Sequence, residues 1–207
     1  MSSTFAVTVL VVSAALGSTA AQAEPTMSIG SATINPGGSA TVNLNISGLG
    51  NGTSLGAFDV NVGFNSSVIS FNSTTFGDPM LGDQLDLEGF GTIDGTTPGT
   101  STVEAFDISL DSPTALTTSQ PSSFTLASFT FTAVSSGLSS LMLSVNSLAD
   151  QIGNSISSSI ENGSIAVGSG QTLAAPEIDP ASAGTALIFL SGCLAVIRDR
   201  SRRSRGK

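Results

Sequence analysis

Carboxylates are the only side chains in the central region of this chain that offer strong acid–base or metal-binding chemistry. Five of them crowd one glycine-rich stretch between residues 77 and 95: Asp78, Asp83, Asp86, Glu88 and Asp94. Calcium binds oxygen ligands in a flexible geometry, so such a stretch is able to form a calcium site. The spacing matches no EF-hand or repeat loop, and a solvated acidic loop is the plainer interpretation. Two readings therefore stay open: a solvated loop, or a calcium site whose ligands are Asp78, Asp83, Asp86 and Glu88.

A pair of carboxylates can also act as the two catalytic groups of a glycosidase, and Glu88 with Glu104 is the candidate pair. Solvated surface acids are far commoner than such pairs. Composition excludes the other reactions, because residues 24–175 contain no Lys, Arg, His, Cys, Trp or Tyr. This region has no ordinary zinc site, no Ser-His-Asp triad, no thiolate and no Schiff-base lysine. We expect a protein that is not an enzyme and that has no cofactor other than calcium.

The charge of the chain is divided between its body and its end. From Glu24 to Glu161 there are twelve acidic side chains and no basic one, whereas all six Lys and Arg residues lie between Arg198 and Lys207. Binding to nucleic acid requires cations that face the phosphates. Nucleic acid is therefore excluded as a partner of the central region.

Alternating apolar and polar residues predict strands throughout the central region. Residues 40–46 and 58–64 show the clearest period of two, and the glycine-rich turn between them predicts that these strands are adjacent. In 103–110 and 124–131 the apolar phase slips by one residue, which predicts a β-bulge in each. Residues 141–145 and 165–167 provide the last strands. No helical period precedes residue 175, so we predict an all-β sandwich.

Two long runs of this region resemble the opening and the close of a cohesin domain. The first contains PGGS at 36–39, a strand, and LGAFDVNVGFNSSVISF at 55–71; the second contains LASFTFTA at 126–133, a glycine turn, a strand, LADQIGN at 148–154 and NGSIAV at 162–167. The resemblance implies a jelly-roll-like β-sandwich of about nine strands. It also implies a dockerin-bearing partner, because cohesins bind dockerins through one sheet face. Phe64-Asn65-Ser66 replaces the family's frequent aromatic-Asp-Pro turn, so the fold is implied more strongly than dockerin binding.

The first 23 residues predict a secretory signal peptide. Phe5–Leu16 is an apolar run of suitable length, and Ala21 and Ala23 form an A-x-A cleavage motif before Glu24. The run is too short for a membrane span. We therefore expect export, and a mature body that is stabilised by its core, since Cys193 is the only cysteine and has no partner for an intrachain disulfide.

The last 32 residues predict a membrane-directed tail. Residues 181–197 are apolar and uncharged but short for a span, and the cationic cluster follows them directly, which is typical of a membrane stop with a cytoplasmic basic end. The tail resembles PEP-CTERM sorting signals in the residues that precede the apolar segment: Pro176, Glu177, Ile178, Asp179 and Pro180. The resemblance implies processing by an exosortase-type membrane transpeptidase. Ile178 stands where proline is usual in that signal.

Four regions are thus expected: a signal peptide at 1–23, a cohesin-like sandwich at 24–168, a linker at 169–175, and a sorting signal with a short transmembrane helix and an Arg-rich end at 176–207. The expected function is that of an exported interaction module of the cell envelope or the extracellular matrix, with extracellular polysaccharide as one partner. Two alternatives stay open. One is a carbohydrate-binding module, although Trp and Tyr stacking platforms are absent. The other is a cohesin that docks a dockerin-bearing protein.

Overall fold

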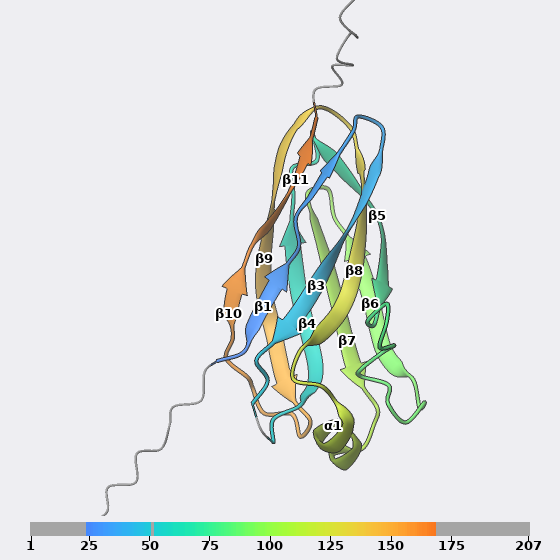
Figure 1. Cartoon of the computed structure of the whole chain (residues 1–207), viewed down its shortest axis with the longest axis vertical. Helices are drawn as coiled ribbons and strands as arrows, with labels where there is room; N and C mark the ends of the chain where they lie inside the picture. Colours follow the sequence, from blue (N-terminus) through green and yellow to red (C-terminus); the bar gives the residue numbers. More distant parts are fainter. Residues whose placement is uncertain (1–23, 51, 169–207) are drawn as a thin grey trace, which may run out of the picture. The chain divides into compact units, whose positions relative to one another are not determined.

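The computed structural model describes residues 24–50 and 52–168, which fold into two β-sheets packed face to face (Figure 1). The predicted signal peptide, linker and sorting signal lie outside the described residues. Within the described part of the chain, no helix has the length and apolar character needed to cross a membrane. The elements in chain order are β1 (Thr26–Ile29), β2 (Ala32–Ile34), β3 (Ser39–Ser47), β4 (Leu55–Gly63), β5 (Ile69–Phe76), β6 (Thr92–Pro98), β7 (Thr102–Ser109), α1 (Pro113–Ser119), β8 (Phe124–Ala133), β9 (Gly137–Asp150), β10 (Ser159–Glu161) and β11 (Gly163–Val167).

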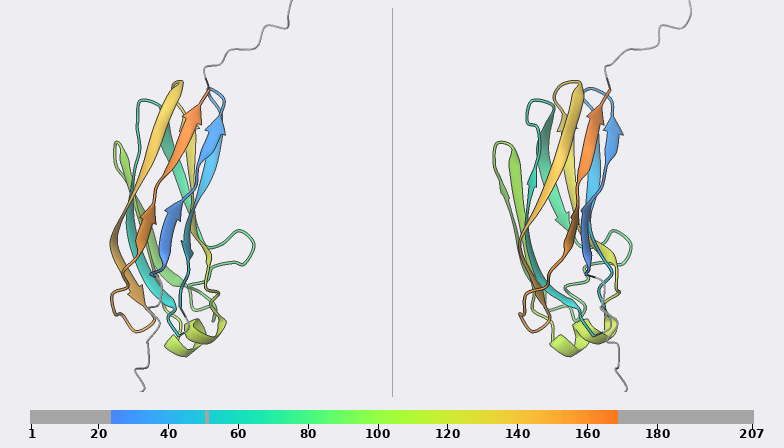
Figure 2. Two further views of the ribbon diagram at one scale, coloured as in Figure 1. Left: turned by 60° about the vertical axis from the view of Figure 1, so that its left-hand side comes forward. Right: turned by 90° about the vertical axis from the view of Figure 1, so that its left-hand side faces the viewer.

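The predicted β-sandwich is confirmed. One sheet has five strands in the order β10-β1-β3-β8-β5, and the other has six in the order β2-β11-β9-β4-β7-β6. Neighbouring strands pair antiparallel, except that β1 pairs parallel with β10 and β2 pairs parallel with β11. Figure 2 shows the two sheets from the side as separate layers. The core lies between them and is built from the inward positions of both sheets.

Strands β3 and β4 lie in different sheets, so the prediction that they are adjacent is wrong. Strand β3 lies between β1 and β8, and β4 lies between β9 and β7. The turn between β3 and β4 therefore carries the chain across the sandwich, and Leu44 and Val60 meet in one core from opposite sides. A period of two shows that a strand has one buried face, but it does not show which strand lies beside it.

One of the two predicted β-bulges is confirmed. In β8, Leu44 pairs with Ala127 while the next residue of β3 pairs with Thr125, so Leu126 is the extra residue. In β7 the prediction is wrong, because its pairing with both neighbours is continuous. The inward position after Ala105 is therefore Asp107, and the apolar residues on either side of Asp107 face outward.

Helix α1 was not predicted, and it covers one end of the sandwich (Figure 1). The Ser112 side chain caps it by accepting a hydrogen bond from the Ala115 N–H at 3.3 Å, and Pro113 occupies the start of the helix, where a missing N–H costs nothing. Leu116 is its buried residue. Seven residues are too few to show an apolar period, but the Ser-Pro start was a readable signal.

Gly163 in β11 has no room for a side chain. A Cβ there would lie 2.1 Å from the carbonyl oxygen of Gly30 and 2.6 Å from that of Ile29. Because both are backbone atoms, relief requires the sheet itself to shift. We expect Gly163→Ala to lower the free energy of unfolding by about 3 kcal/mol, measured by urea denaturation. Gly30→Ala is the matched control, since its Cβ would be 3.5 Å from the nearest atom, and equal losses in the two variants would contradict this explanation.

Candidate docking surface and acidic cluster

The outer face of the six-stranded sheet carries exposed apolar side chains in its strands. Ile93 of β6 and Ile108 of β7 are direct cross-strand neighbours and are 53% and 42% exposed. Met142 and Leu138 of β9 are exposed farther along the same face. We call the outward residues of β6, β7, β4 and β9 the docking face. Ile93 and Ile108 thus lie beside one end of β4, and Met142 lies beside the other, about 20 Å away along the strand. Exposed apolar groups on one face are a mark of an interaction site.

An aromatic ring lies flat on the docking face between these apolar groups. A Cβ at Gly95 of β6 would lie 2.7 Å from the Phe106 ring of β7, so the ring covers the bare backbone of Gly95. A larger residue at position 95 would displace the ring. The bulge predicted in 103–110 would have turned Phe106 and Ile108 inward; because β7 has no bulge, both lie on the outward side of the strand.

A hydrogen-bonded polar group lies in the middle of the docking face. The Asn61 amide donates to the Asn146 side-chain oxygen at 3.0 Å, and the Asn146 amide donates to Asp59 at 3.0 Å. Asn146 is the extra residue of a bulge in β9, because Asp59 pairs with Ser147 and the next residue of β4 pairs with Val145. A bulge re-aims a side chain, and here it brings Asn146 within reach of both partners on β4.

The outer face of the five-stranded sheet has a different character. Its central strands, β3 and β8, contribute no exposed large apolar side chain. Their polar side chains bond to one another across the strands, in the pairs Ser39–Thr132, Thr41–Thr130, Asn43–Ser128 and Asn45–Thr125. Groups that are already paired have little to gain from a ligand. The two faces therefore differ in what they offer a partner.

Asp78, the first predicted calcium ligand, stabilises its own turn by accepting backbone hydrogen bonds. One of its oxygens accepts hydrogen bonds from the Met80 and Leu81 N–H groups, at 2.8 and 3.0 Å, and the other accepts from the Thr125 N–H at 3.0 Å. These backbone hydrogen bonds, that from Thr125 first, lower the pKa of Asp78 below its ordinary value. The carboxylate thus has a complete structural role.

The other three predicted calcium ligands also bind backbone N–H groups. Asp83 accepts from Leu85, Asp86 accepts from Gly91, and Glu88 accepts from Ser112. Nowhere in residues 24–50 and 52–168 do three acidic, His or Cys side chains come together as a metal site would require. Calcium binding stays a prediction, and the structure does not bring its four named ligands to one point.

The candidate glycosidase pair is not brought together either. Glu88 binds the backbone of Ser112 beyond the end of β7, whereas Glu104 lies near the beginning of that strand. Five residues of extended strand alone span roughly 16 Å. The catalytic carboxyl groups of glycosidases are at most about 9.5 Å apart.

Asp107 is a buried carboxylate that the sequence analysis did not single out. It is 0% exposed, and neither of its oxygens has a hydrogen-bond partner. Burial raises the pKa of Asp107 to about 7; the nearby Thr92 hydroxyl is the larger opposing influence, the Ile108 N–H is a smaller one, and the charges of Asp83 and Asp94 add to the rise. A strict period of two counted from Val103, through Ala105 to residue 107, would have predicted this inward position from the sequence.

Asp107 belongs to a larger acidic cluster, which we define as Asp83, Asp86, Asp94, Asp107 and Asp111. Burial raises the pKa of Asp83, with smaller contributions of the same sign from the charges of Asp86, Asp94 and Asp111 and an opposing hydrogen bond from the Leu85 N–H. No residue from 24 to 168 is basic. The cluster therefore has no cation of the described chain to balance it.

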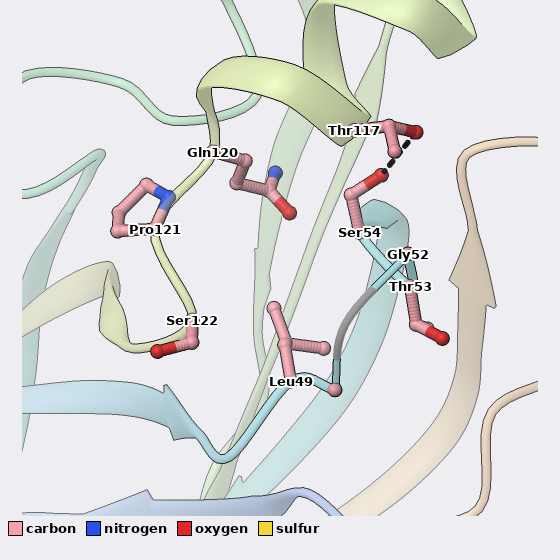
Figure 3. Close-up of a pocket in the computed structure, with 9 residues that line it drawn as sticks. Leu49, Gly52, Thr53, Ser54, Thr117, Gln120, Pro121 and Ser122 are labelled. Atoms are coloured by element: carbon pink, nitrogen blue, oxygen red, sulfur yellow. Dashed lines mark hydrogen bonds between the residues drawn. The ribbon is translucent and has the colours of Figure 1, made fainter.

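A small polar pocket lies beside α1 (Figure 3), with a volume of about 220 Å³. The Ser54 and Thr117 hydroxyls face each other in it at 3.5 Å. The Gln120 amide at its wall holds the main chain, since it accepts from the Leu55 N–H and donates to the carbonyl oxygens of Leu55 and Gln84. None of the residues that line the pocket is titratable. It offers no acid–base chemistry.

Comparison with known proteins shows a cohesin-like fold. A cohesin from the archaeon Archaeoglobus fulgidus, described as non-cellulosomal, superposes with a TM-score of 0.54 at 14% identity over 72% of this chain and 94% of its own. The cohesin CaCohA2 from Clostridium acetobutylicum gives 0.55 at 20% identity, over 72% and 93%. A chain of a type I cohesin–dockerin complex from Clostridium thermocellum gives 0.57 at 10% identity, over 70% and 94%. No family model matches the sequence, and no curated protein is similar to it in sequence.

Proposed function

We propose that this protein is an exported, non-catalytic interaction module that binds a dockerin-bearing protein through the docking face. The contrast between the two outer faces carries this proposal. One face pairs its polar groups internally, whereas the other leaves Ile93, Ile108 and Met142 exposed around a polar centre. The cohesin-like fold supports it, because solved structures with this fold include cohesin–dockerin complexes.

The composition of the docking face indicates the chemistry of its partner. Protein interfaces combine an apolar centre with a polar rim and about one hydrogen bond per 100–200 Å². Asp59 and Glu104 supply acceptors on this face, and no described residue supplies a cation. We therefore infer a partner surface that carries apolar groups together with Lys or Arg.

Both ends of the chain are proposed to serve delivery. The signal peptide, cleaved between Ala23 and Glu24, directs export, and the segment from Pro176 to Pro180 directs processing by an exosortase-type transpeptidase. The protein would pass from a membrane-anchored precursor in the cell envelope to the cell surface or the medium. Strand β11, the last described strand, ends at the end of the sandwich opposite α1 (Figure 1).

The delivery proposal is tested by comparing intact protein with a variant that ends at residue 175. The intact mass of the native protein is expected to show loss of residues 1–23 and cleavage in the tail. The truncated variant is expected to shift from the membrane fraction to the medium. Identical distribution of the two proteins would contradict sorting by the tail.

Docking is tested by placing charge on the docking face. We expect the double variant Ile93→Lys/Ile108→Lys to retain less than a tenth of the dockerin-bearing protein that the wild type captures from a native envelope extract, because an ammonium group is costly in an apolar contact and is repelled by the Lys or Arg inferred on the partner. Both residues are about half exposed, so the fold should persist, which circular dichroism checks. Val134→Lys is the matched control, since Val134 is 59% exposed but lies in the connection between β8 and β9. Absence of any dockerin-bearing protein from the wild-type capture would contradict the proposal.

Carbohydrate binding has less support in the described residues. The Ser, Thr and Asn side chains of β3 and β8 are engaged with one another, and Phe90 is the exposed aromatic residue of this part of the chain, at 67%. A single ring on a loop is a poor platform for a polysaccharide, which stacks on several. Retention of the protein on an immobilised extracellular polysaccharide, lost on Phe90→Ala, would revive this alternative.

A further inference from the structure

The free edge of the six-stranded sheet is strand β6, together with the connection of residues 77–91 that precedes it. Strand β6 pairs with β7 alone, and the connection of residues 77–91 lies over the end of β7. At the end of β7 this connection is held by Ser109 Oγ, which donates to the Leu85 carbonyl oxygen, by the Leu87 and Glu88 N–H groups, which donate to Asp111, and by the Ser112 N–H, which donates to Glu88. Farther from β7, Gln120 donates to the Gln84 carbonyl oxygen and the Thr125 N–H donates to Asp78. The connection buries Leu85 and Gln84. Edges with few partners are where local opening costs least.

Asp107 lies on the inward side of β7, two residues before Ser109, where this edge closes. Acids face it from both elements of the edge: Asp94 is its cross-strand partner in β6, and Asp83 comes from the connection. The strand on the other side, β4, places Phe58 opposite it, and β5 contains no titratable residue. No element packed around Asp107 therefore supplies a positive charge.

We propose that Asp107 is a proton-operated latch: when it is neutral, β6 and residues 77–91 close over β7, and when it is ionised, this edge opens. An ionised carboxylate without a partner is very costly in a buried site. Opening the edge admits water to Asp107 and separates it from Asp83 and Asp94. Opening breaks the Gln120–Gln84 hydrogen bond and exposes Leu85, while the other strands of the sheet keep their pairing.

Hydrogen exchange of the amides between residues 83 and 98 tests the latch, with rates corrected for the intrinsic effect of pH. In the wild type we expect the opening equilibrium of these amides to rise at least tenfold between pH 5 and pH 8, since each pH unit is worth up to a factor of ten. Asp107→Asn should stay protected at both values. Glu104→Gln is the matched control, because it removes a charge from the outward side of the same strand and should respond as the wild type does. The latch is refuted if Asp107→Asn keeps the wild-type response, or if amides of β1 and β3 respond equally.

A second variant and the addition of calcium also test the latch. Asp94→Asn removes a charge that repels the ionised Asp107 in the closed edge, so the rise in opening between pH 5 and pH 8 should be smaller than in the wild type, and an undiminished rise would count against the latch. Calcium chloride added to the wild type at pH 8 should leave the opening unchanged. Closure by calcium that EDTA reverses would show that a metal ion, not a proton, balances Asp107, and would overturn the proposal.

Discussion

The free energy of unfolding is expected to be greatest near about pH 4 and to fall as the pH rises to about 7. The fall comes from Asp107, whose pKa is raised to about 7 by burial in the folded protein and returns to 3.8 on unfolding. Its contribution is complete below the unfolded value and is lost as pH rises toward the folded value. The full shift corresponds to about 4 kcal/mol. We expect about half of that, because local opening of the edge hydrates the ionised group.

At lower pH the dependence is reversed, and the free energy of unfolding rises as the pH rises. The pKa of Asp78 is lowered by backbone hydrogen bonds, and that of Asp150 is lowered because hydrogen bonds from Asn154 and Ile152 outweigh its desolvation. These two groups stabilise the fold above the ordinary pKa of 3.8, and their contribution is lost as pH falls through their folded values. The two slopes together place the maximum well below neutrality, whereas proteins are usually most stable between about pH 5 and 8.

Urea unfolding of the wild type, Asp107→Asn and Glu104→Gln from pH 3 to pH 8 measures these slopes. Asp107→Asn is expected to be the more stable protein at pH 8 and to lose most of the slope above pH 4. Glu104→Gln should keep that slope. A wild type that is more stable at pH 8 than at pH 5 would show that Asp107 is not the dominant buried charge.

The strands at residues 40–46, 58–64, 124–131, 141–145 and 165–167 were predictable because each of them buries one face, and the period of two records that burial. Strands β6 and β10 contain no fully buried residue and were not predicted. The pairing of the strands was not, as β3 and β4 show. Both strands have a clean alternation, but their apolar faces meet across the core instead of lying side by side in one sheet. Pairing depends on long-range contacts that a local pattern does not contain.

The position of the docking face depended on a single strand. Phe106 and Ile108 of β7, with Leu110 just after the strand, form an apolar period, and taking that period as the buried one hid both the docking face and Asp107. The structure buries Asp107 and exposes Ile108 because β7 pairs without a bulge on both sides. A charged residue at an inward position breaks the binary pattern, and such breaks are expected where a protein has a function to perform.

The predicted calcium ligands illustrate another limit of sequence. Asp78, Asp83, Asp86 and Glu88 are close in the chain, yet each accepts a hydrogen bond from a different part of the backbone. Asp and Glu favour such local bonds in turns as readily as they favour metals. The spacing of these acids along the chain therefore did not distinguish a loop held by its own hydrogen bonds from a calcium site.

The largest loss of stability is expected from Phe131→Ala. Phe131 is 0% exposed in β8, and its ring contacts Phe64 and Phe71 edge to face, with centroids 5.3 and 5.9 Å apart. Phe64 follows β4 of the six-stranded sheet, so this aromatic group joins the two layers. Removing such a ring costs about 3–5 kcal/mol. A single domain has a stability of about 5–15 kcal/mol, so the variant should be near its unfolding threshold.

Phe90→Ala provides the matched control for this prediction, because it deletes the same ring from a residue that is 67% exposed. It should change the free energy of unfolding by less than about 0.5 kcal/mol. Phe131→Leu should recover part of the loss, since it restores apolar volume but not the edge-to-face contacts. Similar losses for Phe131→Ala and Phe90→Ala in urea would mean that the sheets are joined chiefly by the aliphatic residues. In that case the pH-dependent contribution of Asp107 would be a larger share of the free energy of unfolding.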